Sequence, residues 1–214
     1  LQREPIMKVY TAAQMREREQ AAVDKGTSFD QLMENAGSSA ARDLMQRHPQ
    51  AGRALIVCGK GNNGGDGLVM ARYMQAQGWH IDILFSLGEN LSPLAQTNRE
   101  RLKGLPHIEL ISAQELEGRL KKGYDIIIEG IFGTGFSGAL PTEIAALCRQ
   151  LNHSDGLKVA LDIPTGLNCD TAEADPDTFR ADLTYTFGAY KPAHLSESGK
   201  PYCQETVCLP IGID

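Results

Sequence analysis

The chain has 214 residues, of which 42% are hydrophobic and 22% are charged, a composition typical of one globular domain with a substantial core. Its formal net charge of -6 argues against a general nucleic-acid-binding protein, which usually carries a basic excess. No apolar run approaches the length of a membrane span, and the first residues lack the apolar core of a signal peptide. We therefore expect one cytoplasmic domain that binds neither nucleic acid nor a membrane.

The cysteines and histidines do not have the spacing of a metal site. The five cysteines include no Cys-x-x-Cys pair, and no two of the five histidines stand four residues apart. Zinc sites in proteins usually show one of these spacings. The sequence therefore predicts free thiols in a reducing compartment, and histidines that bind no metal.

The apolar residues are spaced as in helices first and as in alternating strands and helices afterwards. Helices are predicted over 11–23 and 28–47, opening at Thr11 and Ser28, residue types that cap helices. Short apolar runs then predict strands over 53–58, 80–85, 107–111, 125–130, 158–164, 181–187 and 205–209. Further helices are predicted between them over 66–77, 93–103, 113–122 and 142–151. This order favours one α/β domain over 1–214, a three-layer Rossmann-like sandwich with a mostly parallel sheet and an N-terminal helical extension.

The loop after the first strand, GKGNNGGDG (59–67), carries five glycines in nine residues. Gly59, Gly61 and Gly64 have the spacing of the dinucleotide-binding pattern. Glycine lets a backbone approach a ligand closely, and the amide groups at the start of the next helix can bind phosphate. We therefore expect a phosphate cradle here. A tight turn without a ligand is the alternative, and it does not require so many glycines.

The loop does not fit the usual dinucleotide site in one respect. That site needs an acidic residue at the end of the second strand to bind the ribose. Here the position is occupied by LFSLG (84–88), and Asp82 lies inside the strand instead. A P-loop is excluded as well, because no Gly-Lys-Ser/Thr follows. The glycine pattern therefore indicates a phosphate cradle and does not by itself identify a dinucleotide site.

Two further loops leave predicted strands and carry polar residues. The segment EGIFGTGFSG (129–138) contains Thr134 and Ser137 among its glycines, with a plain flexible connection as the alternative. In LDIPTG (161–166), Asp162 ends an apolar strand and is a candidate acid or base, or else a cap of the following turn. Ligands bind past the carboxyl ends of parallel strands, and all three loops leave predicted strands at that edge.

Three residues of these loops offer oxygen atoms to a cation. Asn63, Glu129 and Thr165 have no sulfur or imidazole near them in their motifs. Hard cations select oxygen ligands, and a set of mostly neutral donors fits a monovalent ion better than magnesium. We therefore expect a monovalent cation if the loops converge.

The motifs GNNGGDGLVMAR, FGTGFSG and LDIPTGLN occur in that order, with LMENAG before them and LTYTFGAYK after them. In this they closely resemble the YjeF N-terminal domain family, the NAD(P)HX epimerases, from about Met15 to the C-terminus. The resemblance implies a repair activity on NADHX and NADPHX, which are NADH and NADPH hydrated at C6 of the nicotinamide ring. The enzyme interconverts their R and S epimers for an ADP- or ATP-dependent dehydratase specific for the S form. In many bacteria that dehydratase is fused to this domain, and the C-terminal LPIGID resembles the junction.

The resemblance also implies a set of site residues. Substrate contacts carry over to Asn62, Asn63, Gly64, Gly65, Asp66, Gly133, Thr134, Gly135, Phe136, Ser137, Gly138 and Ala139. A potassium ion would bind Asn63, Glu129 and Thr165. The family usually has Asp in place of Glu129, which implies that the ion here is held at a slightly different distance or through water. It usually has Ser in place of Thr165, which keeps the hydroxyl.

The catalytic assignment follows from the carboxylates within the motifs. Asp162 is expected to contact the reacting ring as a base with a pKa near the working pH. Asp66 is expected to be held by its loop and Glu129 by the ion. Lys191 could be a second acid or a phosphate ligand, with a solvated surface lysine as the alternative.

The resemblance further implies a homodimer, with the N-terminal helices as the expected contact. Two other functions stay open at this point. One is a non-catalytic dinucleotide- or RNA-binding scaffold of the same fold, and the other is an ordinary hydride-transferring oxidoreductase. The intact loops and the negative net charge disfavour the scaffold, and the missing ribose-binding acid disfavours hydride transfer.

Overall fold

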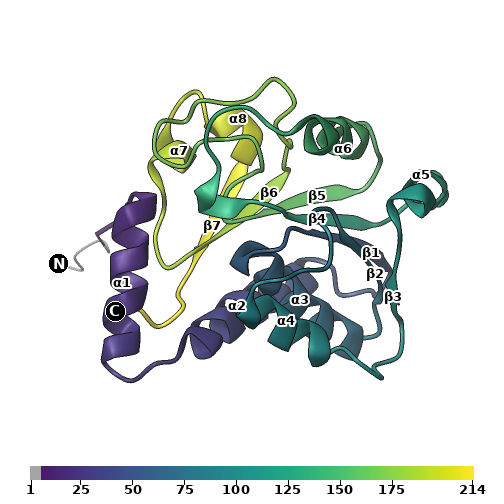
Figure 1. The fold of residues 1–214 in the computed structure, drawn as a ribbon, viewed down its shortest axis with the longest axis horizontal. Helices are drawn as coiled ribbons and strands as arrows, with labels where there is room; N and C mark the ends of the chain where they lie inside the picture. The colour runs from purple at the N-terminus through teal and green to yellow at the C-terminus, as the bar shows by residue number, and fades with distance from the viewer. Residues whose placement is uncertain (1–5) are drawn as a thin grey trace.

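The computed structural model describes residues 6–214, which form a parallel sheet between two layers of helices (Figure 1). The strands within this range are β1 (Arg53–Cys58), β2 (His80–Phe85), β3 (Ile108–Leu110), β4 (Ile126–Gly130), β5 (Leu157–Leu161), β6 (Leu183–Phe187) and β7 (Glu205–Leu209). Their order in the sheet is β3-β2-β1-β4-β5-β6-β7, and every pair is parallel. The predicted three-layer α/β fold is confirmed.

The sheet order creates a place for a ligand. After β1 the chain adds strands on one side, and from β4 onward it adds them on the other side. The connections after β1 and after β4 therefore diverge, and in parallel sheets such a divergence leaves a crevice at the carboxyl ends of the two strands. The loops after β1, β4 and β5 all open at this edge.

Helices cover both faces of the sheet. The helices within residues 6–214 are α1 (Ala12–Asp24), α2 (Phe29–Arg47), α3 (Asn62–Ala76), α4 (Pro93–Glu100), α5 (Ala113–Lys122), α6 (Thr142–Asn152), α7 (Pro192–Leu195) and α8 (Lys200–Cys203), with the 3₁₀ turn η1 (Gly133–Gly135). The side chains of a strand alternate between its faces. Accordingly Ile56 and Ile128 join the core under α2 and α3, and Leu55 and Ile127 join the core under α5 and α6. No helix within residues 6–214 is both long and apolar enough to span a bilayer.

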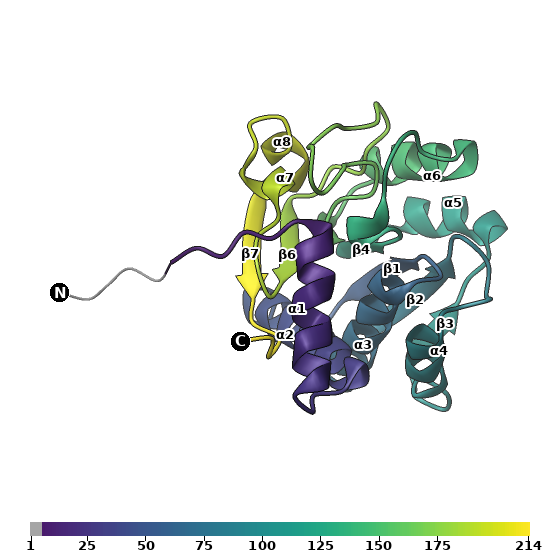
Figure 2. The ribbon, with the colours of Figure 1, turned by 60° about the vertical axis from the view of Figure 1, so that its left-hand side comes forward.

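The first helix lies outside the two layers. Figures 1 and 2 show α1 at one end of the molecule, reaching from one helical layer to the other. A capping box starts it, in which the Thr11 hydroxyl accepts from the Gln14 amide and the Gln14 side chain accepts from the Thr11 amide. Its buried residues, Ala12, Met15 and Ala22, face the rest of the domain. The predicted N-terminal helical extension is therefore confirmed as an end wall.

Several predicted boundaries are wrong, and one error matters for the site. The helix expected to begin at residue 66 begins at Asn62, so NNGGD is the first turn of α3 and not a loop. Glycine disfavours helices in isolation, but packing requires it here. A Cβ at Gly64 would lie 2.5 Å from the Gly59 carbonyl oxygen, and one at Gly65 would lie 2.6 Å from Met33.

The other differences are smaller. The strand expected to run to residue 164 ends at Leu161, and the helix expected to run to residue 103 ends at Glu100. The strand expected over 107–111 is limited to Ile108–Leu110, and the strand expected from residue 181 begins at Leu183. The short helices α7 and α8 are not predicted from the sequence, because four residues are too few to show helical periodicity.

The packing of α2 on α3 can be tested at Gly37. A Cβ added there would lie 2.4 Å from the Val69 Cβ and 2.8 Å from the Asp66 carbonyl oxygen. Overpacking of this kind costs about 1–3 kcal/mol, so we expect Gly37→Ala to lower the free energy of unfolding in urea by that amount.

The matched control is Gly118→Ala in α5, where an added Cβ would meet no atom within 4 Å. Alanine is the better helix former there by about 0.5–1 kcal/mol, so this variant should be more stable than the wild type. Equal stability of both variants would contradict the close contact between α2 and α3.

Candidate functional site

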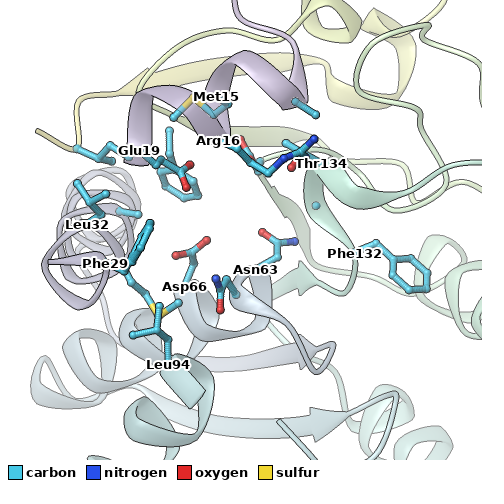
Figure 3. A pocket seen from close by; sticks show the side chains of 18 residues that line it. Met15, Arg16, Glu19, Phe29, Leu32, Asn63, Asp66, Leu94, Phe132 and Thr134 are labelled. Atoms are coloured by element: carbon cyan, nitrogen blue, oxygen red, sulfur yellow. The ribbon is translucent and has the colours of Figure 1, made fainter. Parts of the chain in front are cut away.

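A cavity of about 260 Å³ opens at the carboxyl edge of the sheet, between α1, α2 and the first turn of α3 (Figure 3). Helices α1 and α2 supply most of its apolar wall, including Met15, Phe29 and Leu32. Its polar side chains are Arg16, Glu19, Asn62, Asn63, Asp66, Thr134 and Asp162. An apolar wall with a few convergent polar groups is typical of a small-molecule site.

The first turn of α3 brings two polar residues to the cavity. Asn62 and Asn63 line it, and the preceding Gly61 offers no side chain to cap the first amide groups of the helix. Uncapped amide groups at a helix start are suited to bind an anion. Gly64 and Gly65 do not line the cavity, because they pack against the rest of the domain.

The second loop contributes less than expected. Only Gly133 and Thr134 of residues 133–139 line the cavity. Phe136 is buried in the core beneath α5 and α6. The remaining residues of the segment, Gly135, Ser137, Gly138 and Ala139, are exposed outside the lining. The cavity lining therefore ends within the 3₁₀ turn at Gly133–Gly135.

Glu129 and Thr165 lie together in a buried polar cluster. The Glu129 carboxylate accepts from the Ile131 amide at 2.9 Å, from the Thr165 amide at 3.1 Å and from the Thr165 hydroxyl. Burial raises the pKa of Glu129 to about 7 against the effect of these hydrogen bonds. Among residues 6–214, no lysine or arginine pairs with it.

Asn63 borders this cluster with an unusual side chain. Both polar atoms of its amide are buried, and neither has a hydrogen-bond partner within the described part of the chain. The side chain packs on Gly133, where an added Cβ would lie 3.0 Å from its Cγ. A buried amide without partners is rare in folded proteins and calls for an explanation such as a bound ion.

Asp162 stands directly after β5 in a strained conformation. Its φ of 67° is in the left-handed region, which costs a non-glycine residue on the order of 1–3 kcal/mol. Its amide donates to the Tyr185 carbonyl at 2.6 Å, and its own carbonyl accepts from His194 at 2.7 Å. Its Oδ1 accepts from Lys191 at 2.8 Å and from Thr186 at 2.7 Å. These contacts fix the backbone so that the carboxylate faces the cavity.

The charge state of Asp162 differs from the expectation. Burial by itself raises the pKa of this carboxyl, but the positive charge of Lys191 and the hydrogen bonds from Lys191 and Thr186 outweigh it. The pKa therefore falls below its usual value. The prediction that Asp162 has a pKa near the working pH is therefore wrong, and Asp162 is ionised at neutral pH.

Lys191 is neither a surface lysine nor a cavity residue. Its side chain is fully buried, and its ammonium group contacts four oxygen atoms behind Asp162. Besides Asp162 Oδ1 these are Thr186 Oγ1 at 2.8 Å, the Phe187 carbonyl at 2.9 Å and the Ala189 carbonyl at 3.0 Å. An ammonium group enclosed in this way has no position left for a phosphate.

His194 completes the support of Asp162. Its Nδ1 accepts from the Lys191 amide at 2.9 Å, so its Nε2 carries the proton that is donated to the Asp162 carbonyl. Burial lowers the pKa of His194 to about 4. The ring is therefore neutral at neutral pH and orients Asp162 without adding charge.

Asp66 and Glu19 reach the cavity without partners of their own. Asp66 was expected to be held by its loop, but within residues 6–214 its carboxyl makes no hydrogen bond, and in Figure 3 it points into the cavity. Burial, followed by the charges of Asp162 and Glu19, raises its pKa well above the usual value, and Lys191 opposes the shift. Burial and then Asp162 also raise the pKa of Glu19.

Sequence reasoning missed the contribution of α1. Ala12, Met15, Arg16 and Glu19 all line the cavity, and their i, i+3, i+4, i+7 spacing places them on one helical face. That spacing puts two charged residues on the same face as the apolar ones. This shared face is the feature of the sequence from which the contribution of α1 to the cavity could have been predicted.

The family model and the similar proteins indicate the same family. The family model described as YjeF-related protein N-terminus matches residues 29–193. The chain is 35% identical over 216 residues to the NAD(P)H-hydrate epimerase of Elusimicrobium minutum, covering 97% of this chain and 96% of that protein. It is 38% identical over 187 residues to the bifunctional NAD(P)H-hydrate repair enzyme Nnr of Pyrobaculum aerophilum, covering 85% of this chain and 37% of that protein.

A solved structure supports the same fold. The crystal structure of yeast ynu0 superimposes with a TM-score of 0.79 at 21% identity, covering 94% of this chain and 87% of that one. In length, the chain spans nearly all of the Elusimicrobium epimerase and well under half of the Pyrobaculum bifunctional enzyme.

The buried position of Lys191 can be tested by its removal. Lys191→Met leaves the Asp162 charge without its counter-ion, and breaking a buried ion pair in this way costs about 3–5 kcal/mol. We expect the free energy of unfolding in urea to fall by that amount. The control is Lys200→Met, whose ammonium pairs with exposed Glu197 and which should change the free energy by less than about 1 kcal/mol. If Lys191 were exposed to solvent, both variants would lower the free energy of unfolding by an equally small amount.

Proposed function

This chain belongs to the YjeF-related N-terminal family, and we propose that it epimerises hydrated NADH and NADPH. In these damaged cofactors water is added at C6 of the nicotinamide ring, giving R and S epimers. Their interconversion allows a dehydratase that accepts one epimer to repair both. The observation that carries the proposal is the end-to-end match with the Elusimicrobium epimerase.

The cavity supports this reaction better than hydride transfer. Strand β2 ends at Phe85, and the hydroxyl of the following Ser86 donates a hydrogen bond to the Cys58 carbonyl. The position that holds the ribose-binding acid of ordinary dinucleotide sites therefore has no carboxylate. The carboxylates instead gather in the cavity as Glu19, Asp66 and Asp162, where proton transfer needs them.

The arrangement of the cavity suggests how the substrate binds. The phosphates would lie against the first amide groups of α3 at Asn62 and Asn63, with Thr134 beside them. The hydrated ring would lie between Asp66 and Asp162, covered by the apolar wall of α1 and α2. This wall excludes water, which strengthens electrostatic interactions with the ring.

A potassium ion fits the residues beside the cavity. Within residues 6–214, Asn63 has an unpartnered carbonyl oxygen, Glu129 is a buried carboxylate without a basic partner, and Thr165 offers a hydroxyl oxygen. A monovalent cation prefers such an oxygen set. When bound, it would balance the Glu129 charge and hold the loops after β4 and β5 in place for the substrate.

The partners are proposed on the same grounds. The chain would form a homodimer, for which the exposed side of α1 is the candidate contact, since symmetric dimers are the commonest oligomers. It would work with an NAD(P)HX dehydratase, because relatives such as the Pyrobaculum protein are bifunctional repair enzymes. A cytoplasmic location is supported by its five cysteines, all of them free thiols.

The activity can be tested with a single epimer. Incubation of the wild-type protein with pure R-NADHX should produce the S epimer until the two reach equilibrium, as measured by chromatography. Asp162→Asn keeps an acceptor for Lys191 and Thr186 but removes the base, so the rate should fall by roughly 10²–10⁴. Binding should stay within a few-fold. Exposed Asp155→Asn should match the wild type, and a fast Asp162→Asn enzyme would contradict the role of Asp162.

The cation site can be tested through thermal stability. A ligand that binds only the folded state at about 100 times its Kd stabilises it by about 2.7 kcal/mol. We expect potassium chloride to raise Tm above the value in tetramethylammonium chloride at the same ionic strength. Glu129→Gln should abolish the difference, and Glu117→Gln, which removes an exposed partner of Lys121, should retain it. A Tm that is identical in the two salts would refute the site.

A further inference from the structure

Three carboxyl groups from distant parts of the chain converge on the cavity. Glu19 comes from α1, Asp66 from α3 and Asp162 from the end of β5. Figure 3 shows the carboxyls of Glu19 and Asp66 both pointing into the open space. They share one low-dielectric environment, so each charge acts on the others.

Among the residues that the structure describes, only one of the three carboxyls has a bonded counter-ion. Asp162 accepts from the buried ammonium of Lys191 at 2.8 Å, and only its Oδ1 is engaged by side chains. Within residues 6–214 neither Asp66 nor Glu19 makes an ion pair, although the distant charges of Lys191 and Arg16 partly oppose the rise in the pKa of Glu19. The site therefore stabilises one ionised carboxylate and leaves its neighbours without a partner.

This environment separates the protonation states of the carboxyls. Burial and the charges of Asp162 and Glu19 raise the pKa of Asp66, and Lys191 and Thr186 bring that of Asp162 below its usual value. The α2 side of the cavity contributes apolar residues such as Phe29, Leu32 and Met33 and no charge. Two neighbouring carboxyls whose pKa values are driven apart form an acid and a base.

We propose that Asp66 is the proton donor of the epimerisation and Asp162 the proton acceptor, with Glu19 as a positioning residue for Asp66. The assignment rests on the proposed function and deepens it. Both catalytic carboxyls line the cavity, whereas Lys191, behind Asp162, does not. An acid and a base acting together are required because C6 must lose one bond and regain it on the opposite face.

The proton balance is the same for either bond. If the C6–O bond breaks, Asp66 protonates the leaving hydroxyl, and the N1 lone pair forms an N1=C6 double bond. Water then adds to the other face, the electron pair returns to N1, and Asp162 takes the proton of the incoming water. Transfer of that proton from Asp162 back to Asp66, through the water released from C6, restores both carboxyls. If the C6–N1 bond breaks, Asp162 takes the hydroxyl proton to give C6=O, and Asp66 protonates the departing nitrogen. Closure on the other face returns both protons.

Glu19 gives this assignment a specific pH dependence. Its negative charge opposes ionisation of Asp66, so it extends the pH range in which Asp66 carries a proton. The rate should decline as pH rises through the pKa of Asp66. Removal of the Glu19 charge should move that decline to lower pH, with little effect on the rate at lower pH.

The test is the pH profile of kcat/KM with pure R-NADHX. Asp66→Asn keeps the shape of the side chain and should slow the reaction by roughly 10²–10⁴, with ligand affinity within a few-fold. Glu19→Gln should stay active and shift the alkaline decline downward. The matched control is Glu17→Gln, two residues along α1 at an exposed position outside the cavity, which should leave the profile unchanged.

An infrared measurement without substrate tests the protonation directly. The difference spectrum between the wild type and Asp66→Asn at neutral pH should contain the carbonyl band of a protonated carboxyl. Taking the difference removes any contribution of Glu129. The band should disappear at lower pH in Glu19→Gln than in the wild type.

The possible outcomes separate the two proposals. A wild-type protein that leaves R-NADHX unchanged overturns the proposed function. An active wild type with an equally fast Asp66→Asn variant overturns only the assignment of the acid. Absence of the carboxyl band overturns that assignment whatever the activity, and identical pH profiles for Glu19→Gln and Glu17→Gln overturn the role of Glu19.

Discussion

The buried ion pair between Lys191 and Asp162 is the interaction on which the site depends. Each charge alone would be costly in the interior, and the cost is offset because the two lie 2.8 Å apart with further hydrogen bonds on both. The pair connects the end of β5 to the segment between β6 and α7. It thus joins two neighbouring strand ends at the edge where the cavity opens.

The ion pair also explains the strained backbone at Asp162. A left-handed conformation persists in a non-glycine residue only when its surroundings determine it strongly. Here the Tyr185 carbonyl, the His194 ring and the Lys191 ammonium hold the amide, the carbonyl and the carboxylate of one residue. Hydrogen bonds on all three groups leave Asp162 little freedom, so the carboxylate is preorganised toward the cavity before any ligand arrives.

Carboxyl groups of the same chemistry therefore acquire different pKa values and charges although they lie in or beside the same cavity. Asp162 is kept ionised by a lysine, Asp66 is driven toward its protonated form, and Glu129 is buried with a pKa of about 7 and only neutral donors. The partners and burial of each group decide its charge, since its intrinsic pKa is nearly the same. Helix α1 closes this arrangement, because it supplies both the apolar cover and Glu19.

The sequence by itself determined the fold class and the location of the site. Apolar runs such as 53–58 and 125–130 fit only buried strands, and the order of elements fixed a parallel sheet whose loops meet at one edge. Asp162 and Thr134 were named from those loops and line the cavity. The substrate contacts and the potassium site stay predictions.

Only the tertiary structure decided the environment of each group. Lys191 sits in the polar stretch GAYKPAH, which does not indicate burial, and its four oxygen partners come together only when β5 and β6 are side by side. Glu19 lies more than a hundred residues from Asp162, and the close approach of the Gly59 carbonyl, which leaves no space for a Cβ at Gly64 in the first turn of α3, appears only in the folded chain. Local patterns record which face of an element is apolar, whereas burial and charge depend on contacts between segments far apart in the chain.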